Sequence, residues 1–294
     1  MIVILLASAL WLMGAVYSLT LVRAARARAQ GRPGMESIGL GAVTDFFDTL
    51  GIGSFAPTTA WLKLRGLTPD GYIPATLNAG HALPTIVEAL IFINLVRVDP
   101  LLLGACIAAA VAGAVVGAPM VTRLPLRTVQ AAVGAALLIA AALYTLTNLG
   151  LMPGGGAALR LPIGLFAIAV AAHFLLGGLM TLGIGLYAPS LILLSLMGLN
   201  PTAAFPIMMG ACAFLMPVSG FRFMRSERID LRVVLGLAIG GIPAVLLAAL
   251  VVKSLPLAAI RWGVVVVVLY AAFILLRAAW RVAPGVSPPA SAPP

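Results

Sequence analysis

Long apolar runs separated by short polar stretches dominate the chain. Each run is close to the roughly 20 residues that a helix needs to cross a lipid bilayer. The runs lie near residues 1–22, 73–96, 100–122, 128–149, 162–180, 203–221, 233–252 and 258–280. Two stretches, 38–64 and 170–197, are also apolar but are interrupted by glycine and proline. The pattern predicts an all-α polytopic membrane protein in which these two stretches are broken helices.

The two broken stretches contain nearly the same phrase. Residues 49–57 read TLGIGSFAP and residues 181–189 read TLGIGLYAP, which is an offset of 132 positions. At that offset, 15 of the 37 positions in 49–85 are identical to 181–217, without a gap. A match of this length indicates an internal repeat.

The repeat divides the chain into one additional N-terminal span and two homologous halves. The predicted order is a transmembrane helix at 1–22, a basic linker at 23–37, repeat 1 at 38–150, a linker at 151–161, repeat 2 at 162–281 and a disordered Pro-rich tail at 282–294. Each half consists of one broken stretch followed by three uninterrupted spans.

The distribution of basic residues predicts how the broken stretches lie. If each enters the membrane and returns on the same side as a hairpin, 14 of the 18 Lys and Arg residues fall on one side. If each crosses fully, the division is only 12 against 6. The positive-inside rule therefore favours hairpins, with the N-terminus outside and the C-terminus in the cytoplasm of a bacterial inner membrane. Three crossings per half make the two repeats inverted relative to each other.

Composition changes this interpretation little. Hydrophobic residues make up 62% of the chain and charged residues 9%, which is typical of a membrane protein. The formal net charge of +10 comes from residues at the ends of apolar runs, so it predicts topology and not a nucleic-acid partner. Cys106 and Cys212 both lie within spans and indicate neither a disulfide nor a metal cluster. We expect no cofactor, and the sequence leaves the oligomeric state open.

The repeated phrase that interrupts each broken stretch predicts an anion-binding site. Gly51 and Gly53 permit unusual backbone angles, Ser54 can cap a new helix, and Pro57 suits its first turn, so a half-helix is expected over 55–65. The start of such a helix carries about half a positive charge and free N–H groups inside the membrane. Two starts facing one cavity would bind an anion. The candidate binding residues are Thr49, Gly51, Gly53, Ser54, Phe55, Ala56, Thr181, Gly183, Gly185, Leu186, Tyr187 and Ala188.

Ionisable side chains are concentrated in the first half. Asn78, His81, Thr85 and Glu88 share one face of a predicted helix, and Asp45 and Asp48 share another. Ionisable groups inside a membrane are costly and are usually functional. Asp45, Asp48, Asn78, His81 and Glu88 are therefore candidates for coupling transport to a proton or sodium ion. The alternative is that His81 and Glu88 pair with each other as structural groups.

Two other functions remain open at this point. A divalent-cation transporter could use Asp45, Asp48, His81 and Glu88, although helix N-termini repel cations. An intramembrane enzyme could use His81 and Glu88 as acid and base, but the chain contains no common catalytic motif or nucleotide loop. We therefore expect a transport protein and not an enzyme.

The stretch DFFDTLGIGSFAPTTAW at 45–61, the stretch PATLNAGHALPTIVEA at 74–89 and the second GIGLYAP resemble the TauE/SafE family of sulfite exporters. The resemblance covers about residues 38–281. It implies a permease, built from two similar halves, that moves sulfite, sulfonates or related organosulfur anions through the lipid bilayer. It leaves the direction of transport and the coupling ion open.

Overall fold

The structure is a computed structural model, and it describes residues 2–117, 126–151, 156–181, 183–225, 228–254 and 256–281. The expected tail at 282–294, residues 152–155 of the expected linker and residues 118–122 of an expected span lie outside these residues. The helices are α1 (Ile2–Ala27), α2 (Met35–Thr49), α3 (Phe55–Arg65), α4 (Ile73–Gly80), α5 (Ala82–Leu95), α6 (Pro100–Ala112), α8 (Leu126–Asn148), α9 (Ile163–Met180), α10 (Tyr187–Leu196), α11 (Pro201–Arg225), α12 (Leu231–Ser254) and α13 (Leu257–Arg281). Short 3₁₀ and π turns occupy Asp70–Tyr72 and Gly113–Gly117.

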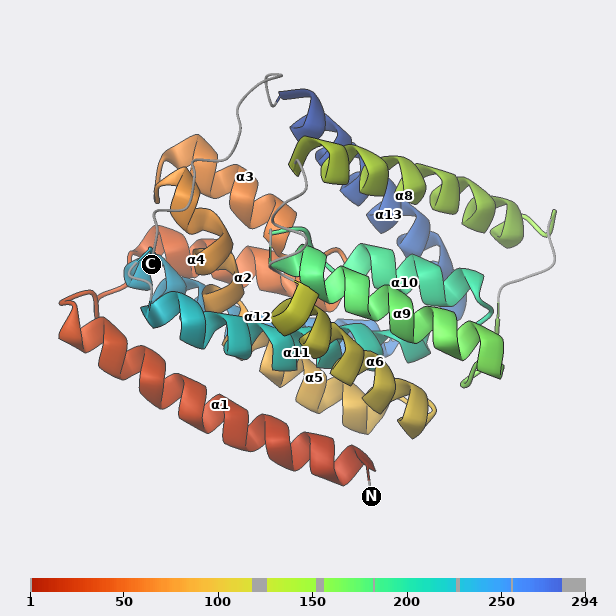
Figure 1. Cartoon of the computed structure of the whole chain (residues 1–294), viewed down its shortest axis with the longest axis horizontal. Helices are drawn as coiled ribbons and strands as arrows, with labels where there is room; N and C mark the ends of the chain where they lie inside the picture. The colour runs from red at the N-terminus through yellow and green to blue at the C-terminus, as the bar shows by residue number, and fades with distance from the viewer. Residues whose placement is uncertain are drawn as a thin grey trace.

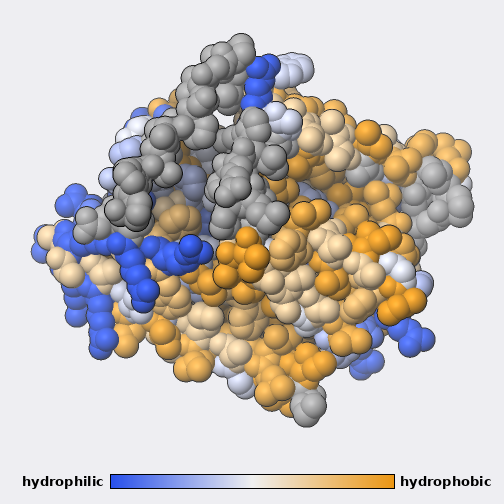
Figure 2. Space-filling view, in the orientation of Figure 1, coloured by the Kyte–Doolittle hydropathy of each residue, from blue (hydrophilic) through white to orange (hydrophobic). Residues whose placement is uncertain are grey.

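The helices form a bundle suited to a lipid bilayer. Among the described residues, six helices are long and apolar enough to cross a membrane: Ile2–Ala27, Ile73–Leu95, Ile163–Met180, Pro201–Arg225, Leu231–Val251 and Trp262–Trp280. Figure 2 shows hydrophilic residues gathered toward the left and the lower right, with a broad hydrophobic surface between them. Large apolar side chains such as Trp11, Leu138 and Trp280 are exposed. Contiguous apolar surface of this extent requires a lipid or protein environment, so the expectation of an all-α polytopic membrane protein is confirmed.

The two halves contain the same elements in the same order. Helices α2 and α3 correspond to α9 and α10 at the offset of 132 residues, and the break after Thr49 corresponds to the break after Met180. The pair α4–α5 then corresponds to α11, α6 to α12, and α8 to α13. Helix α3 covers the residues that the sequence predicted for the half-helix, and its last turn contains Lys63 and Arg65.

Glycine makes both breaks possible. Gly51 and Gly53 in the first break have φ values of 92° and 88°, and Gly183 in the second has 85°. Backbone angles of this kind are strained for any residue with a Cβ atom. Gly185 differs, because its φ is not positive. The expectation that both glycines of the second phrase repeat the first was therefore wrong for Gly185.

In each broken stretch, the start and the end lie close together. At the first, Arg65 at the end of α3 forms an ion pair of 2.8 Å with Glu36 in the first turn of α2. At the second, the Asn200 N–H beyond α10 donates to the Ala158 carbonyl oxygen before α9 at 2.8 Å. A stretch whose two ends are bonded together is a hairpin.

The open ends of the two hairpins lie at opposite ends of α11. This helix begins at Pro201, directly after Asn200, and runs for 25 residues, or about 37 Å at 1.5 Å per residue. Near its other end, the Met224 carbonyl oxygen accepts a hydrogen bond from Arg28, which precedes α2. Figure 1 shows α2–α3 and α9–α10 approaching the middle of the molecule from the left and the right.

Close glycine contacts hold each hairpin against the opposite half. Helix α2 packs on α12, and the equivalent pair α9 and α6 pack in the same way. A Cβ atom on Gly41 of α2 would overlap the backbone of Leu237, and one on Gly177 of α9 would overlap the backbone of Ala110. The two interfaces therefore depend on backbones that approach without intervening side chains.

The α2–α12 contact can be tested with two glycines of one helix. A Cβ added at Gly41 has no space, whereas one added at Gly39 meets nothing within 4 Å. Overpacking costs about 1–3 kcal/mol, so Gly41→Ala should clearly lower the midpoint of thermal unfolding of the detergent-solubilised protein. Gly39→Ala should leave the midpoint unchanged or slightly raised, because alanine favours a helix. Equal midpoints for the two variants would contradict this packing.

Candidate functional site

A small cavity lies where the two hairpin tips meet. The first tip is the break between α2 and α3, and the second is the break between α9 and α10. The space open to the centre of a water molecule is about 20 Å³, which is enough for about one water-sized group. Both tips contribute to its wall, together with α5 and α11. The lining residues are Asp48, Gly53, Ser54, Phe55, Thr85, Met180, Gly185, Leu186, Tyr187 and Met216.

About half of the residues predicted for the anion site line this cavity. The hydroxyls of two others are bonded to their own helices, because Thr49 donates to the Asp45 carbonyl oxygen at 2.9 Å and Thr181 to that of Gly178 at 2.7 Å. The predicted residues outside the lining are Thr49, Gly51, Ala56, Thr181, Gly183 and Ala188. The cavity thus joins the two phrases through three consecutive residues of each, Gly53–Phe55 and Gly185–Tyr187.

The first tip is capped by a carboxylate. The Ser54 N–H donates to Oδ1 of Asp48 at 2.6 Å, and the Ser54 side chain makes no capping bond. The expectation that the Ser54 hydroxyl caps α3 was therefore wrong. Ser54 has helical angles, φ −78° and ψ −26°, whereas a capping serine normally has extended angles that turn its oxygen toward the first amides.

The second tip has no such cap. The position equivalent to Asp48 is Met180, whose thioether is a poor acceptor. Within the described part of the chain, the N–H groups of Gly185, Leu186, Tyr187 and Ala188 donate to no acceptor. These amides start α10 and lie at the buried end of the hairpin, so the second tip retains both free donors and a positive helix end.

The first half contains a buried ion pair beside its tip. His81 Nδ1 lies 2.7 Å from Asp45 Oδ1, and His81 Nε2 lies 3.1 Å from the Thr58 hydroxyl of α3. His81 occupies the bend between α4 and α5, three residues before Pro84, which lacks the N–H that would continue the helix. The bend therefore places the imidazole between α2 and α3, and His81 pairs with Asp45 instead of Glu88.

A second histidine makes a related contact in the other half. His173 Nε2 lies 3.0 Å from the Ser190 hydroxyl of α10, and Ser190 is the repeat equivalent of Thr58. Each returning half-helix is thus joined to a histidine through a hydroxyl at the same position. Sequence analysis missed this similarity because the histidines themselves occupy different positions in the two repeats.

Glu88 connects the two tips. Its Oε2 accepts a hydrogen bond of 2.6 Å from the hydroxyl of Tyr187, the first residue of α10, and its Oε1 lies 2.8 Å from the hydroxyl of Thr49, the last residue of α2. All three side chains are buried. The carboxyl group of Glu88 therefore bridges the end of one hairpin arm and the start of another, from opposite halves of the chain.

The remaining coupling candidate, Asn78, lies away from the cavity. Its side-chain amide donates to the Pro74 carbonyl oxygen of its own helix at 2.9 Å. The four acidic and histidine candidates are also dispersed among different partners: Asp45 with His81, Asp48 with Ser54, and Glu88 with Tyr187. Over the described residues, no three His, Cys, Asp or Glu side chains converge as a metal site would require.

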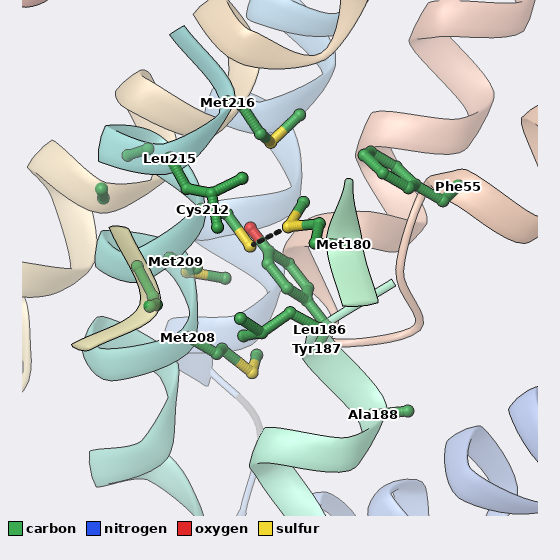
Figure 3. Close-up of a cluster of buried hydrophobic side chains, with 14 of the residues drawn as sticks. Phe55, Met180, Leu186, Tyr187, Ala188, Met208, Met209, Cys212, Leu215 and Met216 are labelled. Atoms are coloured by element: carbon green, nitrogen blue, oxygen red, sulfur yellow. Dashed lines mark hydrogen bonds between the residues drawn. The ribbon is translucent and has the colours of Figure 1, made fainter. Parts of the chain in front are cut away.

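Sulfur-containing side chains lie around Tyr187 (Figure 3), and two of them, Met180 and Met216, line the cavity. Figure 3 shows Met180, Cys212 and Met216 around Tyr187, with the Cys212 thiol 3.5 Å from the Met180 sulfur. The sequence had assigned Cys212 no role in the site, and it did not identify Met180 and Met216 as lining residues. The position of Met180, directly before the second phrase and equivalent to Asp48, is the one signal that could have identified it.

The fold is that of a polytopic membrane protein with a buried cavity between two broken helices, an arrangement that is typical of membrane transport proteins. Residues 165–294, from α9 to the end of the chain, match the family model described as Sulfite exporter TauE/SafE. This match supports the family resemblance over the second half of the chain, and the description of the matching family is that of a sulfite exporter. No curated protein and no solved structure matches the chain significantly.

The bridge through Glu88 can be measured with a double-mutant cycle. Tyr187→Phe removes the hydroxyl and Glu88→Gln the acidic group. Because a hydrogen bond to a carboxyl group joins the two residues, their effects on the free energy of unfolding should be coupled by about 1–3 kcal/mol. Tyr17→Phe is the matched control, because this buried hydroxyl donates to the Ala79 carbonyl oxygen at 2.9 Å. Coupling of similar size in the Tyr17 cycle would indicate a general loss of packing.

Proposed function

We propose that the protein is a secondary transporter of small sulfur-containing anions, such as sulfite, a sulfonate or a related organosulfur compound. The observation that supports this most is the cavity formed jointly by Gly53–Phe55 and Gly185–Tyr187. Backbone N–H groups at helix starts bind anions without a charged side chain. Such a site holds an anion weakly enough to release it, as transport requires.

We further propose that the two repeats are inverted and that the membrane is a bacterial inner membrane. The hairpins open at opposite ends of α11, which supports one hairpin facing the cytoplasm and the other facing outside. The end containing Arg28, Arg65 and Arg225 would be cytoplasmic under the positive-inside rule. Small rocking movements of one repeat against the other would then expose the central cavity to each side in turn.

The coupling ion we propose is a proton. An anion in the cavity lies beside the carboxyl group of Asp48 and near that of Glu88, so its entry is unfavourable unless a proton neutralises one of them. The hydroxyl of Thr49 carries one proton but lies within 2.9 Å of both the Asp45 carbonyl oxygen and Glu88 Oε1. A proton on Glu88 would complete both hydrogen bonds, because Thr49 could then donate to Asp45 and accept from Glu88.

Binding to the purified full-length protein tests the proposed function. We expect calorimetry to detect binding of sulfite or methanesulfonate, and Gly53→Val to weaken it at least about tenfold, or about 1.4 kcal/mol. A valine at this position resists the φ of 88°, and its γ-carbons extend into the cavity beyond an added Cβ that already contacts the Cβ of Tyr187 at 3.9 Å. Gly66→Val is the matched control, since Gly66 also has a positive φ but an added Cβ meets nothing within 4 Å.

A folded Gly66→Val protein should bind like the parent. If both valine variants lose binding equally, backbone strain alone explains the effect and the cavity is not the binding site. If the parent protein binds neither sulfite nor methanesulfonate, the proposed substrate class is wrong.

Topology is tested by labelling single cysteines in a background without Cys106 and Cys212. Gly71, after the first hairpin, and Ala157, before the second, are both exposed. Inverted hairpins require Gly71→Cys to react with a membrane-impermeant thiol reagent only from the cytoplasmic side, and Ala157→Cys only from outside. Reaction of both cysteines from one side would exclude the inverted arrangement.

A further inference from the structure

The two tips are alike in sequence but unequal in chemistry. At the first, the Asp48 carboxyl group accepts the Ser54 N–H at 2.6 Å, so an acidic group of the protein already occupies the helix start. At the second, Met180 replaces the aspartate and the amides from Gly185 to Ala188 donate to no acceptor among the described residues. The positive end of α3 is compensated internally, and that of α10 is not.

The cavity beside the second tip is also lined by a buried hydroxyl group, that of Thr85. Thr85 is 1% exposed and lines the cavity, yet among the residues that the structure describes its Oγ1 makes no hydrogen bond. A threonine inside a helix normally donates to the carbonyl oxygen four residues earlier, which here belongs to His81. A buried hydroxyl without a partner costs free energy unless a ligand or water satisfies it.

We propose that the substrate anion binds at the second tip alone, held by the amides of Gly185–Tyr187 and by the Thr85 hydroxyl, while Asp48 remains the built-in anion of the first tip. The cavity has space for about one water-sized group, so the two tips must move apart to admit the anion. This inference rests on the proposed function and assigns its site more narrowly. Sequence analysis treated the two phrases as equal parts of one anion site. The substitution of Met180 for aspartate makes the second phrase the binding tip and the first a counterpart already filled by the protein.

The chemical difference between the two tips also predicts the charge of the substrate. One uncompensated helix start supplies about half a positive charge, and no Lys or Arg lines the cavity. Asp48 stands across the cavity and opposes a second negative charge on the ligand. The site therefore suits a monoanion, such as a sulfonate or hydrogensulfite, better than a dianion. Phe55, Leu186 and Met216 add apolar wall that favours the organic part of a sulfonate.

The experiment compares methanesulfonate, a monoanion, with sulfate, a dianion of similar head-group shape, by calorimetry on the full-length protein. The parent should bind methanesulfonate at least about tenfold more tightly than sulfate. Thr85→Val should weaken methanesulfonate binding about tenfold, because it removes one hydrogen bond to a charged ligand. Asp48→Asn should reduce the preference for methanesulfonate over sulfate by improving sulfate binding. The substitution removes the opposing acidic group but retains an oxygen that can accept the Ser54 N–H.

Thr76→Val is the matched control. Thr76 lies on α4, is fully buried and also has an unpartnered Oγ1, but it does not line the cavity. A Thr76→Val protein should bind methanesulfonate like the parent, and Thr85→Ser should restore binding lost in Thr85→Val. Thr85→Ala serves as the test if the valine variant does not fold.

Two results would overturn this inference while leaving the proposed function intact. One is unchanged methanesulfonate binding in both Thr85→Val and Thr85→Ala. The other is sulfate binding by the parent as tight as that of methanesulfonate. A parent protein that binds none of sulfite, methanesulfonate and sulfate would overturn the proposed function itself.

Discussion

Inside a bilayer, every backbone N–H and C=O group needs a partner, because lipid offers none. A helix that breaks in the membrane leaves some of its N–H and C=O groups without partners. The rest of the structure depends on how those groups are satisfied or shielded from lipid. Both breaks lie where the two halves meet, and their described residues are buried or partly buried. Close glycine contacts between α2 and α12, and between α6 and α9, bring the halves together closely enough to enclose the tips.

The two tips meet the same requirement in different ways. The first uses a side chain of the protein, Asp48, which replaces the solvent that α3 lacks. The second leaves its amides facing a cavity, where a transported anion can take the role of the missing acceptor. The two repeats thus differ in chemistry: the first tip has a carboxylate acceptor, and the amides of the second have no acceptor among the described residues. We infer that the carboxyl group of Asp48 at the first tip regulates anion binding, whereas the amides of the second tip bind the anion.

Glu88 makes the two tips dependent on each other. Its carboxyl group contacts Thr49 at the end of α2 and Tyr187 at the start of α10, so one hairpin cannot move far without disturbing the bond to the other. The same carboxyl group can hold a proton. In our proposal, the arrival of an anion, the protonation of Glu88 and the movement of the hairpins are linked through these two hydrogen bonds. The Asp45–His81 pair supports the first hairpin from its other side.

The sequence alone determined the spans, the repeat and the breaks, because apolar length and glycine spacing are local properties that survive in any membrane fold. The half-helix at 55–65 was predicted for this reason, and so were the lining residues Gly53 and Tyr187. Only the tertiary structure decided which groups partner each other. Ser54 was expected to cap α3, but helical angles at Ser54 leave that role to Asp48, six residues earlier in the chain. His81 was open to pairing with Glu88, but the bend before Pro84 turns it toward Asp45. Whether two groups form a hydrogen bond depends on differences of a few tenths of an ångström in the distance between donor and acceptor. A pattern along one chain does not contain those distances.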